Sequence, residues 1–460
     1  MKGRRLHGIA LDKETLATHR SRELVETKLT RIAEIARTKP KDVFTSLYHL
    51  LNEEMLLLCH RELEANKAVG VDEVTKKKYE EKLEENIRGL VERLKRHIYK
   101  PQPTRRTYIP KDGRTKRPLG ILSYEDKIVQ RGLYKILAAI YETNFLDHSE
   151  GFREDRNCHR ALMKLDQYLM GKINYVVDAD IKGFFDNVNH EVMMKLISVK
   201  IADPNIKRLI VKFLKAGVME EGEFEETEIG TPQGAIISPI LANIYLHYAV
   251  DLWFVKAFKP ACKGEAQIVR YADDFVCCFQ YKEEAERFYH ALQERLKKFR
   301  LELAENKSKI IEFGRFAADN RTKRGLGKPE TFDFLGFTHY CGKSRNGKFT
   351  VKRKTSKKKF RAKMKAFTMW IKNERNQKRI HEIFKTVKRK LQGHYNYYAI
   401  TDNSQMIWRY YNGVIKLLFK WLNRRSQRKG FCWEKFNKYL TINPIPKPKI
   451  RGMLCELVTR

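Results

Sequence analysis

Hydrophobic and polar positions follow two different periods along the chain. Apolar residues recur every three to four positions in several segments, which predicts helices. These segments are 1–100, 125–143, 189–200, 205–216, 235–258 and 282–300. Short apolar runs predict strands, and they lie at 174–180, 267–279, 309–313 and 331–340. Because helices and strands are mixed, we expect an α+β fold with helices over one face of a mainly antiparallel sheet.

The last quarter of the chain combines helical periodicity with a large excess of positive charge. From Cys341 to Arg460 there are 33 Lys and Arg and 5 Asp and Glu, a net charge of +28, while the other 340 residues carry +9. Apolar and aromatic residues recur there at helical spacing, which predicts amphipathic helices with a buried stripe and a basic outer face. The stripe residues are Phe360, Met364, Phe367 and Ile371, then Trp408, Tyr411, Ile415, Leu418 and Leu422.

Composition narrows the class of protein. With 42% hydrophobic residues the chain can bury real cores, and its net charge of +37 favours a polyanionic partner, usually nucleic acid. The longest apolar stretch, Ala235 to Phe258, contains Pro239, Asn243, His247 and Asp251 and is too polar to span a bilayer. The first residues lack the apolar run of a secretory signal, and the eight cysteines contain no C-x-x-C pair. We therefore expect a reduced, cytoplasmic protein without a membrane partner, associated with the nucleoid when it acts on DNA.

Acidic residues end or interrupt the predicted strands. They are Asp178 and Asp180, Asp186, and the pair Asp273 and Asp274 at the bend of 267–279. Neighbouring carboxylates at strand ends are unfavourable unless a cation neutralises them. Two Mg²⁺ ions about 3.5–4 Å apart, held by carboxylates, carry out nucleotidyl transfer. Any one Asp by itself is better explained as a turn cap, but a Tyr-x-Asp-Asp motif between apolar strands of a basic protein favours the metal site.

Ordered sequence blocks resemble the reverse transcriptases encoded by group II introns, together with the maturase region that follows the polymerase. The likeness covers about Asn66 to Lys449. The blocks are GVDEVT (70–75), YIPKDGRTKRPLGI (108–121), EGFREDRNCHRAL (150–162), VVDADIKGFFDNVNH (176–190), GTPQGAIISPILANIYL (230–246), RYADDFV (270–276), LELAENKSKI (301–310) and FDFLGF (332–337).

The resemblance implies a right-hand polymerase, with fingers, a palm with an antiparallel sheet, and an all-helical basic thumb or maturase (X) domain. The implied units are an N-terminal helical extension (1–65), fingers (66–172), palm (173–320), a palm–thumb connection (321–345) and the thumb or maturase region (346–460). It also implies RNA binding by basic residues of the last unit. These are Lys352, Arg353, Lys354, Lys357, Lys358, Lys359, Arg361, Lys388, Arg389, Arg424 and Arg425.

Catalytic roles follow from the same likeness, residue by residue. Period-2 alternation places Asp178 and Asp180 on one strand face and does not choose between them. The family pattern makes Asp180 the metal ligand, together with Asp273 and, on weaker grounds, Asp274. The implied cofactor is a pair of Mg²⁺ ions, for which Mn²⁺ can substitute.

The nucleotide-binding residues are also implied by matching blocks. Lys111 and Arg117 match fingers residues that bind the triphosphate, since point charge and fork geometry together suit phosphate. Gln233 matches a position beside the incoming nucleotide, and Phe185 matches the aromatic that excludes a ribose 2′-hydroxyl. Lys307 lies where such polymerases often carry a lysine near the leaving pyrophosphate. The open alternatives are solvated cations for the three basic residues, turn support for Gln233 and core packing for Phe185.

The implied function is an RNA-directed DNA polymerase that also binds group II intron RNA to assist splicing and mobility. Its partners would be an RNA template, intron RNA, a DNA primer or target, and deoxynucleoside triphosphates. The Pro-Gly-Arg-Ser usual after Phe-Arg is replaced here by residues 154–158, which leaves the subfamily open, and no C-terminal endonuclease domain is expected. Two alternatives stay open: a splicing maturase with little polymerase use, and a free-standing reverse transcriptase in defence or DNA repair.

Overall fold

A four-stranded antiparallel sheet carries the candidate acidic residues. The structure is a computed structural model that describes residues 13–110, 116–231, 233–425, 430, 432–450 and 452. The order of the strands in the sheet is β6-β7-β3-β8. The strands are β3 (Tyr175–Asp180), β6 (Ala266–Tyr271), β7 (Asp274–Phe279) and β8 (Lys309–Glu312). All of their pairings are antiparallel, as expected from the sequence.

Helices precede, interrupt and follow this sheet. Those before it are α1 (Lys13–Thr38), α2 (Glu53–Glu62), α3 (Lys76–Glu80), α4 (Leu83–Lys95), α5 (Tyr124–Tyr141) and α6 (Cys158–Leu169). Those that follow β3 are α7 (Phe184–Asn187), α8 (His190–Ser198), α9 (Pro204–Leu214), α10 (Ser238–Leu246), α11 (Lys282–Lys298) and α12 (Ala317–Lys323). The C-terminal helices are α13 (Lys357–Glu374), α14 (Ile380–Tyr398), α15 (Ser404–Leu422) and α16 (Trp433–Ile442).

Local capping explains where several of these helices begin. Asp203 accepts hydrogen bonds from the backbone N–H groups of the first turn of α9, which opens with Pro204. Asn157 and Asn189 cap α6 and α8 in the same way. After α10 the helical backbone continues through two π-helical segments, His247–Asp251 and Phe254–Phe258. Among the described residues, no helix has the length and apolar character needed to cross a membrane.

Both faces of the four-stranded sheet are covered, so the expectation of one covered face is wrong. Val177 and Cys277 belong to a first core with α5, α8, α9, α10 and α11, whereas Val176 and Cys278 belong to a second core with α6 and the C-terminal helices. Neighbouring strand residues point to opposite faces. Since the residues on both faces are apolar, each face requires a cover.

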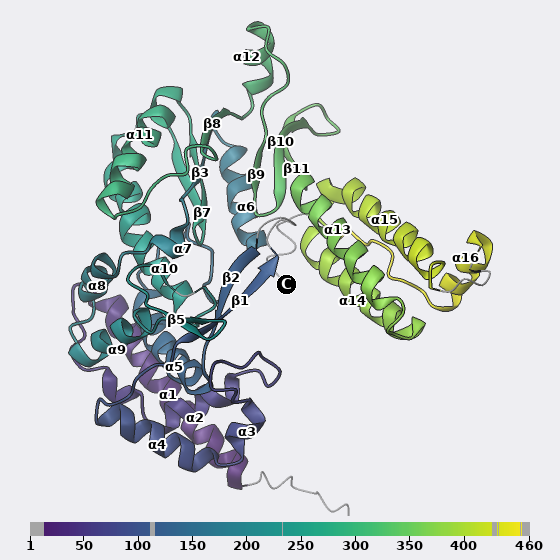
Figure 1. Cartoon of the computed structure of the whole chain (residues 1–460). Coiled ribbons are helices and arrows are strands. Elements are labelled where there is room, and N and C mark those ends of the chain that lie inside the picture. Colours follow the sequence, from purple (N-terminus) through teal and green to yellow (C-terminus); the bar gives the residue numbers. More distant parts are fainter. Residues whose placement is uncertain are drawn as a thin grey trace, which may run out of the picture.

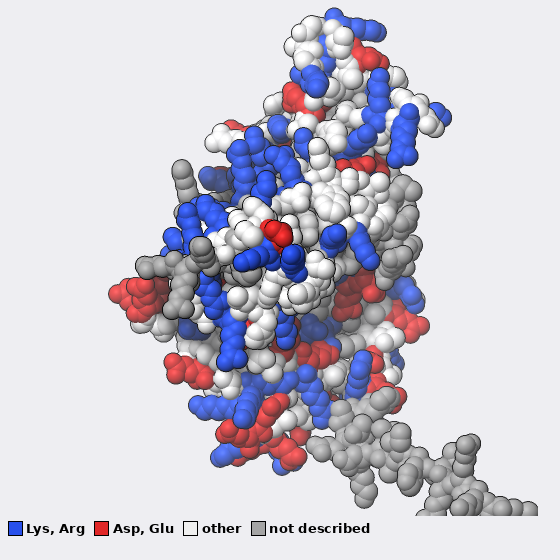
Figure 2. Space-filling view, turned by 90° about the vertical axis from the view of Figure 1, so that its right-hand side faces the viewer, with Lys and Arg blue, Asp and Glu red and all other residues white. Residues whose placement is uncertain are grey.

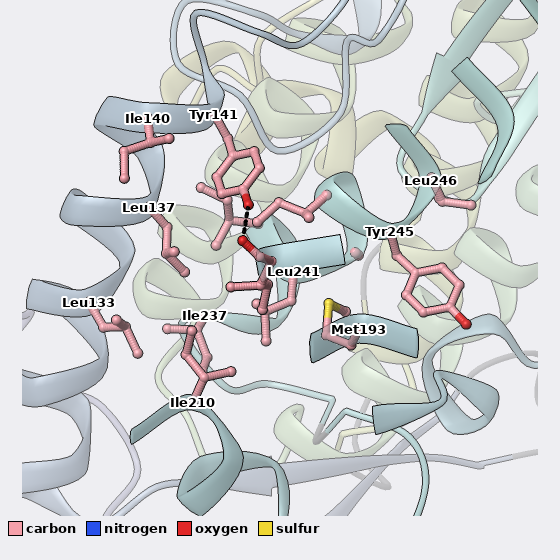
Figure 3. Close-up of a cluster of buried hydrophobic side chains, with 14 of the residues drawn as sticks. Leu133, Leu137, Ile140, Tyr141, Met193, Ile210, Ile237, Leu241, Tyr245 and Leu246 are labelled. Atoms are coloured by element: carbon pink, nitrogen blue, oxygen red, sulfur yellow. Dashed lines mark hydrogen bonds between the residues drawn. The ribbon is translucent and has the colours of Figure 1, made fainter. Parts of the chain in front are cut away.

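The first core joins the N-terminal helices to the sheet. In Figure 3, side chains of α5, including Leu137 and Tyr141, face Ile237 and Leu241 of the α10 region, whereas Tyr245 lies on the far side of α10. The hydroxyl of Tyr141 donates a hydrogen bond of 3.3 Å to the carbonyl of residue 197, so this buried polar group is satisfied. The α5 and α10 helices are therefore fixed relative to each other, and they carry the loops on either side of the candidate site.

A second sheet has the strand order β2-β1-β4-β5. Its strands are β1 (Thr104–Pro110), β2 (Lys116–Ile121), β4 (Val218–Glu220) and β5 (Glu223–Glu225). β1 runs antiparallel to β2 and parallel to β4. The guanidinium of Arg106 pairs with Glu220 at 2.8 Å and with Glu225 at 3.0 Å, which ties β1 to the β4–β5 hairpin.

A third sheet corrects the expected all-helical C-terminal region. Its strand order is β11-β10-β9, and all pairings are antiparallel. The strands are β9 (Phe332–Phe334), β10 (Phe337–Lys343) and β11 (Phe349–Thr355). The predicted boundary at 345/346 therefore lies inside the β10–β11 hairpin, because the basic sequence VKRKT forms a strand with Val351 facing the core.

The four C-terminal helices lie to one side of the molecule, away from α1–α4 (Figure 1). On α13, Phe367 and Ile371 are buried as predicted. On α15 the buried face is turned relative to the prediction: Ile407, Tyr410 and Val414 are buried, while Trp408 is 43% exposed. Leu418 and Leu422 are buried and belong to both the predicted and the observed stripe. Periodicity alone therefore did not decide which residues are buried in the first half of α15.

Candidate active site

The acidic residues from two separate parts of the chain meet at one corner of the four-stranded sheet. Asp180, the last residue of β3, lies directly opposite Asp274, the first residue of β7. Directly opposed residues of antiparallel strands have Cα atoms about 4.5–5.5 Å apart. Asp273 lies in the two-residue turn between β6 and β7, where Ala272 takes a left-handed φ of 59°. The turn therefore places Asp273 and Asp274 beside Asp180.

The carboxylates at this corner repel one another. Burial, followed by the neighbouring charges of Asp178, Asp273 and Asp180, raises the pKa of Asp274 to about 7. Burial is also the main reason why the pKa of Asp178 rises to about 6, although Lys309 opposes the shift. A cation at this corner would relieve the repulsion and favour the ionised carboxylates.

One basic side chain already neutralises part of this charge. The ammonium of Lys307 lies 2.7 Å from the carboxylate of Asp180, and the Lys307 side chain is 68% exposed. The backbone of Asp180 is held by the same segment, since its carbonyl accepts from the N–H of Ala304 and its N–H donates to the Ser308 hydroxyl at 3.1 Å. Lys307 thus contacts a candidate metal ligand. The sequence had placed it near the leaving pyrophosphate, which would lie beside the metal ions.

The donor set, which is all carboxylate, suits a hard divalent cation bound together with a nucleotide. Across the described ranges, no three acidic, His or Cys side chains converge into a ready-made metal site, and Asp180 is directed to Lys307. Mg²⁺ characteristically takes only one or two protein carboxylates and completes its octahedron with water and substrate phosphates. Asp180, Asp273 and Asp274 can supply those carboxylates, and the phosphates would come from the substrate.

A cavity of about 600 Å³ lies between β1, β2, the β4–β5 hairpin and the segment after β3. Phe185 and Gln233 line it, as do Asp186 and Leu119. Phe185 is half-buried, and its ring lies edge-on to that of Phe184, so it both packs on the core and faces the cavity. The described lining does not include the three candidate metal ligands.

The loop carrying Gln233 is held between the segment after β3 and strand β2. Its side-chain amide donates a 3.0 Å hydrogen bond to the carboxylate of Asp186, and its backbone carbonyl accepts one of 2.6 Å from the N–H of Gly120 on β2. Arg117, also on β2, is exposed, opposite Ile109 in the hairpin. Lys111 lies outside the described residues.

Family comparison agrees with this geometry. A model of the family described as reverse transcriptase (RNA-dependent DNA polymerase) matches residues 109–339, which is half of the chain. The chain belongs to the reverse transcriptase family. This membership implies the right-hand polymerase fold and the use of divalent metal ions, and the matched range contains both β3 and the β6–β7 hairpin.

Curated relatives include proteins of group II introns. The group II intron-encoded protein LtrA of Lactococcus lactis subsp. cremoris is 42% identical over 221 residues, 48% of this chain and 37% of LtrA. The uncharacterized 91 kDa protein in cob intron of Schizosaccharomyces pombe is 36% identical over 48% of this chain and 27% of that protein. Protein YkfC of Escherichia coli is 34% identical over 45% of this chain and 62% of YkfC. The chain thus spans less than two thirds of each of these relatives.

Sequence reasoning missed Arg270, which supports the acidic turn of this reverse transcriptase. Its guanidinium is completely buried and forms two bonds to the carboxylate of Asp251, at 2.9 and 2.5 Å. It also donates to Asn243 at 2.9 Å, to the Ser149 hydroxyl at 2.7 Å and to the carbonyl of Ala272 at 3.0 Å. Each of these partners accepts a hydrogen bond from the buried guanidinium of Arg270 and so offsets the cost of burying its charge. The sequence did contain a signal for this pair: Arg270 and Asp251 each lie inside an apolar run. Charged residues in such runs are fully buried almost only when they are paired with an opposite charge.

The loop before α6 also packs against this turn. A Cβ on Gly151 would lie 2.2 Å from the backbone nitrogen of Ala272, so only glycine fits there. Asn243 donates to the carbonyl of Gly151 at 2.8 Å while accepting from Arg270. The turn that carries Asp273 is thus fixed from two directions, by α10 and by the 149–151 segment.

Most of the predicted RNA-binding residues are exposed on the C-terminal side of the molecule. In Figure 2, which faces that side, Lys and Arg outnumber Asp and Glu, above all in the upper half. The exposed candidates are Lys354, Lys357, Lys358, Lys359, Arg361, Lys388, Arg389 and Arg424, and the half-buried ones are Lys352 and Arg425. The guanidinium of Arg424 lies over the ring of Trp421, at 5.3 Å, which orders a cation at the surface.

Arg353 is a correction to the predicted RNA-binding set. It is 7% exposed, and its guanidinium pairs with Asp166 of α6 at 3.0 Å and with Asp402 at 2.9 Å. Alternation along β11 explains the difference, because residues 351, 353 and 355 face the core while 354 faces solvent. Arg353 therefore joins β11 to α6 and is not available to RNA in this structure.

Proposed function

We propose that the chain is an RNA-directed DNA polymerase that copies structured intron RNA and also binds that RNA to assist splicing and mobility. The observation that carries the proposal is the direct opposition of Asp180 and Asp274, with Asp273 in the adjoining turn. Family membership over residues 109–339 supports the same chemistry.

The proposed chemistry assigns the metal to the carboxylates. Asp180 and Asp273, with Asp274, would hold two Mg²⁺ ions, for which Mn²⁺ can substitute. Bound there, the ions would lower the pKa of a primer 3′-hydroxyl and stabilise charge on the α-phosphate. Lys307, which faces Asp180, would exchange this carboxylate for a phosphate oxygen when nucleotide enters.

The fingers and the cavity wall would bind the nucleotide. Lys111 and Arg117 are proposed for the triphosphate, the first as a point charge and the second as a fork. The amide of Gln233 is fixed by Asp186, so its oxygen is left to accept a hydrogen bond from the nucleotide. The ring of Phe185, at the cavity wall, would exclude a 2′-hydroxyl.

The C-terminal region would bind structured RNA through its exposed basic residues. Its net charge of +28 and the ordered cations on α13, α14 and the end of α15 support phosphate contacts. The printed name of LtrA, a group II intron-encoded protein, supports intron RNA as the partner. The proposed place of action is the cytoplasm, at the nucleoid when the target is DNA.

The proposed functional units follow the sequence with one adjustment. Residues 1–65 form a helical extension, 66–172 the fingers and 173–320 the palm, while 321–345 connect the palm to the thumb or maturase region (346–460). Because β10 pairs with β11 along its whole length, the structure favours a connection that extends through Thr355. Helix α6, within the fingers range, packs against β6 of the palm.

Primer extension tests the polymerase. With Mg²⁺, a primed RNA template and deoxynucleotides, the protein should extend the primer, and Asp273→Ala should reduce extension by at least about 10³-fold while RNA affinity stays nearly unchanged. Asp319→Ala, on α12, is the matched control and should extend normally. Retained synthesis in Asp273→Ala would overturn the site assignment. RNA binding and splicing assistance without extension by the unsubstituted protein would favour the maturase alternative, and a free-standing role would show no preference for intron RNA.

A further inference from the structure

The hydroxyl of Tyr397, near the end of α14, lies where the C-terminal region meets the candidate active site. It donates a 2.7 Å hydrogen bond to the carbonyl of Leu335, in the turn between β9 and β10. Burial raises the pKa of Asp274, and the backbone N–H of the same Leu335 opposes that rise. Strand β9, which ends just before this turn, contacts β7, which begins with Asp274. The turn is therefore bonded on one side to α14 and lies on the other beside a candidate metal ligand.

Cys158, at the start of α6, extends this arrangement to the catalytic hairpin. Burial and, after it, the Cys158 thiol raise the pKa of both Tyr271, the residue before the acidic turn, and Tyr397, so the thiol lies close to both hydroxyls. Segments distant in sequence, around residues 158, 271, 335 and 397, therefore lie close together beside the acidic turn.

Neighbouring residues hold Tyr397 in place, while the turn at Leu335 and Gly336 has a strained backbone that needs contacts to hold it. The imidazole of His159 contacts the Tyr397 carbonyl at 2.8 Å, and the ring of Phe337 stacks on the Tyr397 ring with centroids 5.8 Å apart. Leu335 and Gly336 both take left-handed backbone conformations, with φ of 49° and 80°. A non-glycine residue in that region is strained, so the conformation of Leu335 requires fixed contacts on both sides.

We propose that Tyr397 is a positioning residue for the metal site: by fixing the Leu335 turn, it orients the Asp274 carboxylate for the divalent ion. This inference rests on the proposed function. A metal site needs its ligands held to about 0.5 Å by groups behind them. Because Tyr397 belongs to the nucleic-acid-binding region, the position of that region and the order of the metal site are coupled.

The test compares two Tyr→Phe variants on the same helix. Tyr397→Phe removes the hydroxyl that reaches Leu335, while Tyr395→Phe removes one that donates to the carbonyl of Pro446 at 3.0 Å, remote from the acidic corner. For Tyr397→Phe, the Mg²⁺ concentration that half-saturates primer extension should rise about three- to tenfold. The rate should recover at saturating Mg²⁺. It should also recover with Mn²⁺, because Mn²⁺ accepts a looser coordination geometry than Mg²⁺, although it is at the weak end of the divalent series. Template–primer affinity should stay within about twofold.

The control separates positioning from folding. Tyr395→Phe should lose a similar amount of thermal stability and keep the Mg²⁺ dependence of the unsubstituted protein. An unchanged Mg²⁺ dependence in Tyr397→Phe, or an equal shift in both variants, would overturn the inference. Stabilisation by Mg²⁺ with deoxynucleotide, followed as a rise in Tm, gives a second measure on the same three proteins. It decides between these outcomes even if the unsubstituted protein fails to extend a primer, a result that would count against the proposed function alone.

Discussion

The carboxyl of Asp274 is a candidate metal ligand that lowers the stability of the folded protein when it is ionised. The pKa of its carboxyl rises from an ordinary 3.8 to about 7 in the folded protein. The folded state therefore holds a proton that the unfolded chain releases between those two pH values. The stability this carboxyl contributes is complete below the unfolded pKa and is lost as the pH rises through about 7.

Asp274→Asn should accordingly stabilise the metal-free protein at about pH 8, by about 1–3 kcal/mol, because the burial of a charge and its repulsion with Asp178, Asp273 and Asp180 are removed. Near about pH 3 the two proteins should unfold at similar temperatures, because the carboxyl is then largely neutral in both states. Thermal unfolding in a chelating buffer at the two pH values measures this. A lower Tm for the variant at the higher pH would show that the carboxylate is instead stabilised in the fold.

The position of Phe185 is compatible with both of its predicted roles, packing in the core and excluding a ribose 2′-hydroxyl. It packs on Phe184 and also lines the cavity beside Gln233. Removing the ring in Phe185→Ala should admit the ribose 2′-hydroxyl and lower discrimination against ribonucleotides by about tenfold or more. Single-nucleotide incorporation with paired ribo- and deoxyribonucleotides measures the ratio, which is insensitive to a uniform loss of folded protein. Unchanged sugar discrimination would assign Phe185 to the core alone.

At the scale of elements, the start of α13 is the clearest candidate for phosphate contacts. Lys357, Lys358 and Lys359 are all exposed there, directly after the Ser356 cap. Changing the three to Gln should weaken RNA binding and reduce the slope of log affinity against log salt by up to about 2–3, since each phosphate contact contributes about 0.7–0.9. Filter binding over a salt series measures the slope. Changing the exposed pair Lys297 and Lys298 of α11 is the control, and an equal effect there would indicate general charge attraction.

The strands β10 and β11 show why charge alone does not identify a binding surface. Alternation buries Arg353 between two carboxylates while its neighbour Lys354 stays exposed. The same element links the C-terminal helices to α6, through Asp166. A basic run on a strand is therefore divided between structural and surface roles, whereas on the first turn of α13 three consecutive lysines remain at the surface.

At the scale of the whole molecule, two hydrophobic cores share one sheet. The N-terminal helices, α5 and α8–α11 pack on one face, and α6 with the C-terminal helices pack on the other. The acidic corner lies at the end of strands that both cores hold. Residues far apart in the sequence therefore support this corner: Arg270, bonded to Asn243, holds the turn at Ala272, and Tyr397 holds the neighbouring turn at Leu335.

The sequence by itself determined the elements and the chemistry. Apolar periodicity located β3, the β6–β7 hairpin and the major helices, and the ordered motifs identified the acidic residues, because both signals are local in sequence. Only the tertiary structure decided which faces are covered, that Arg353 is buried and that Trp408 is not. It also decided that Arg270, Cys158 and Tyr397 surround the acidic turn. These features depend on contacts between residues that lie far apart along the chain, and no local pattern specifies such pairs.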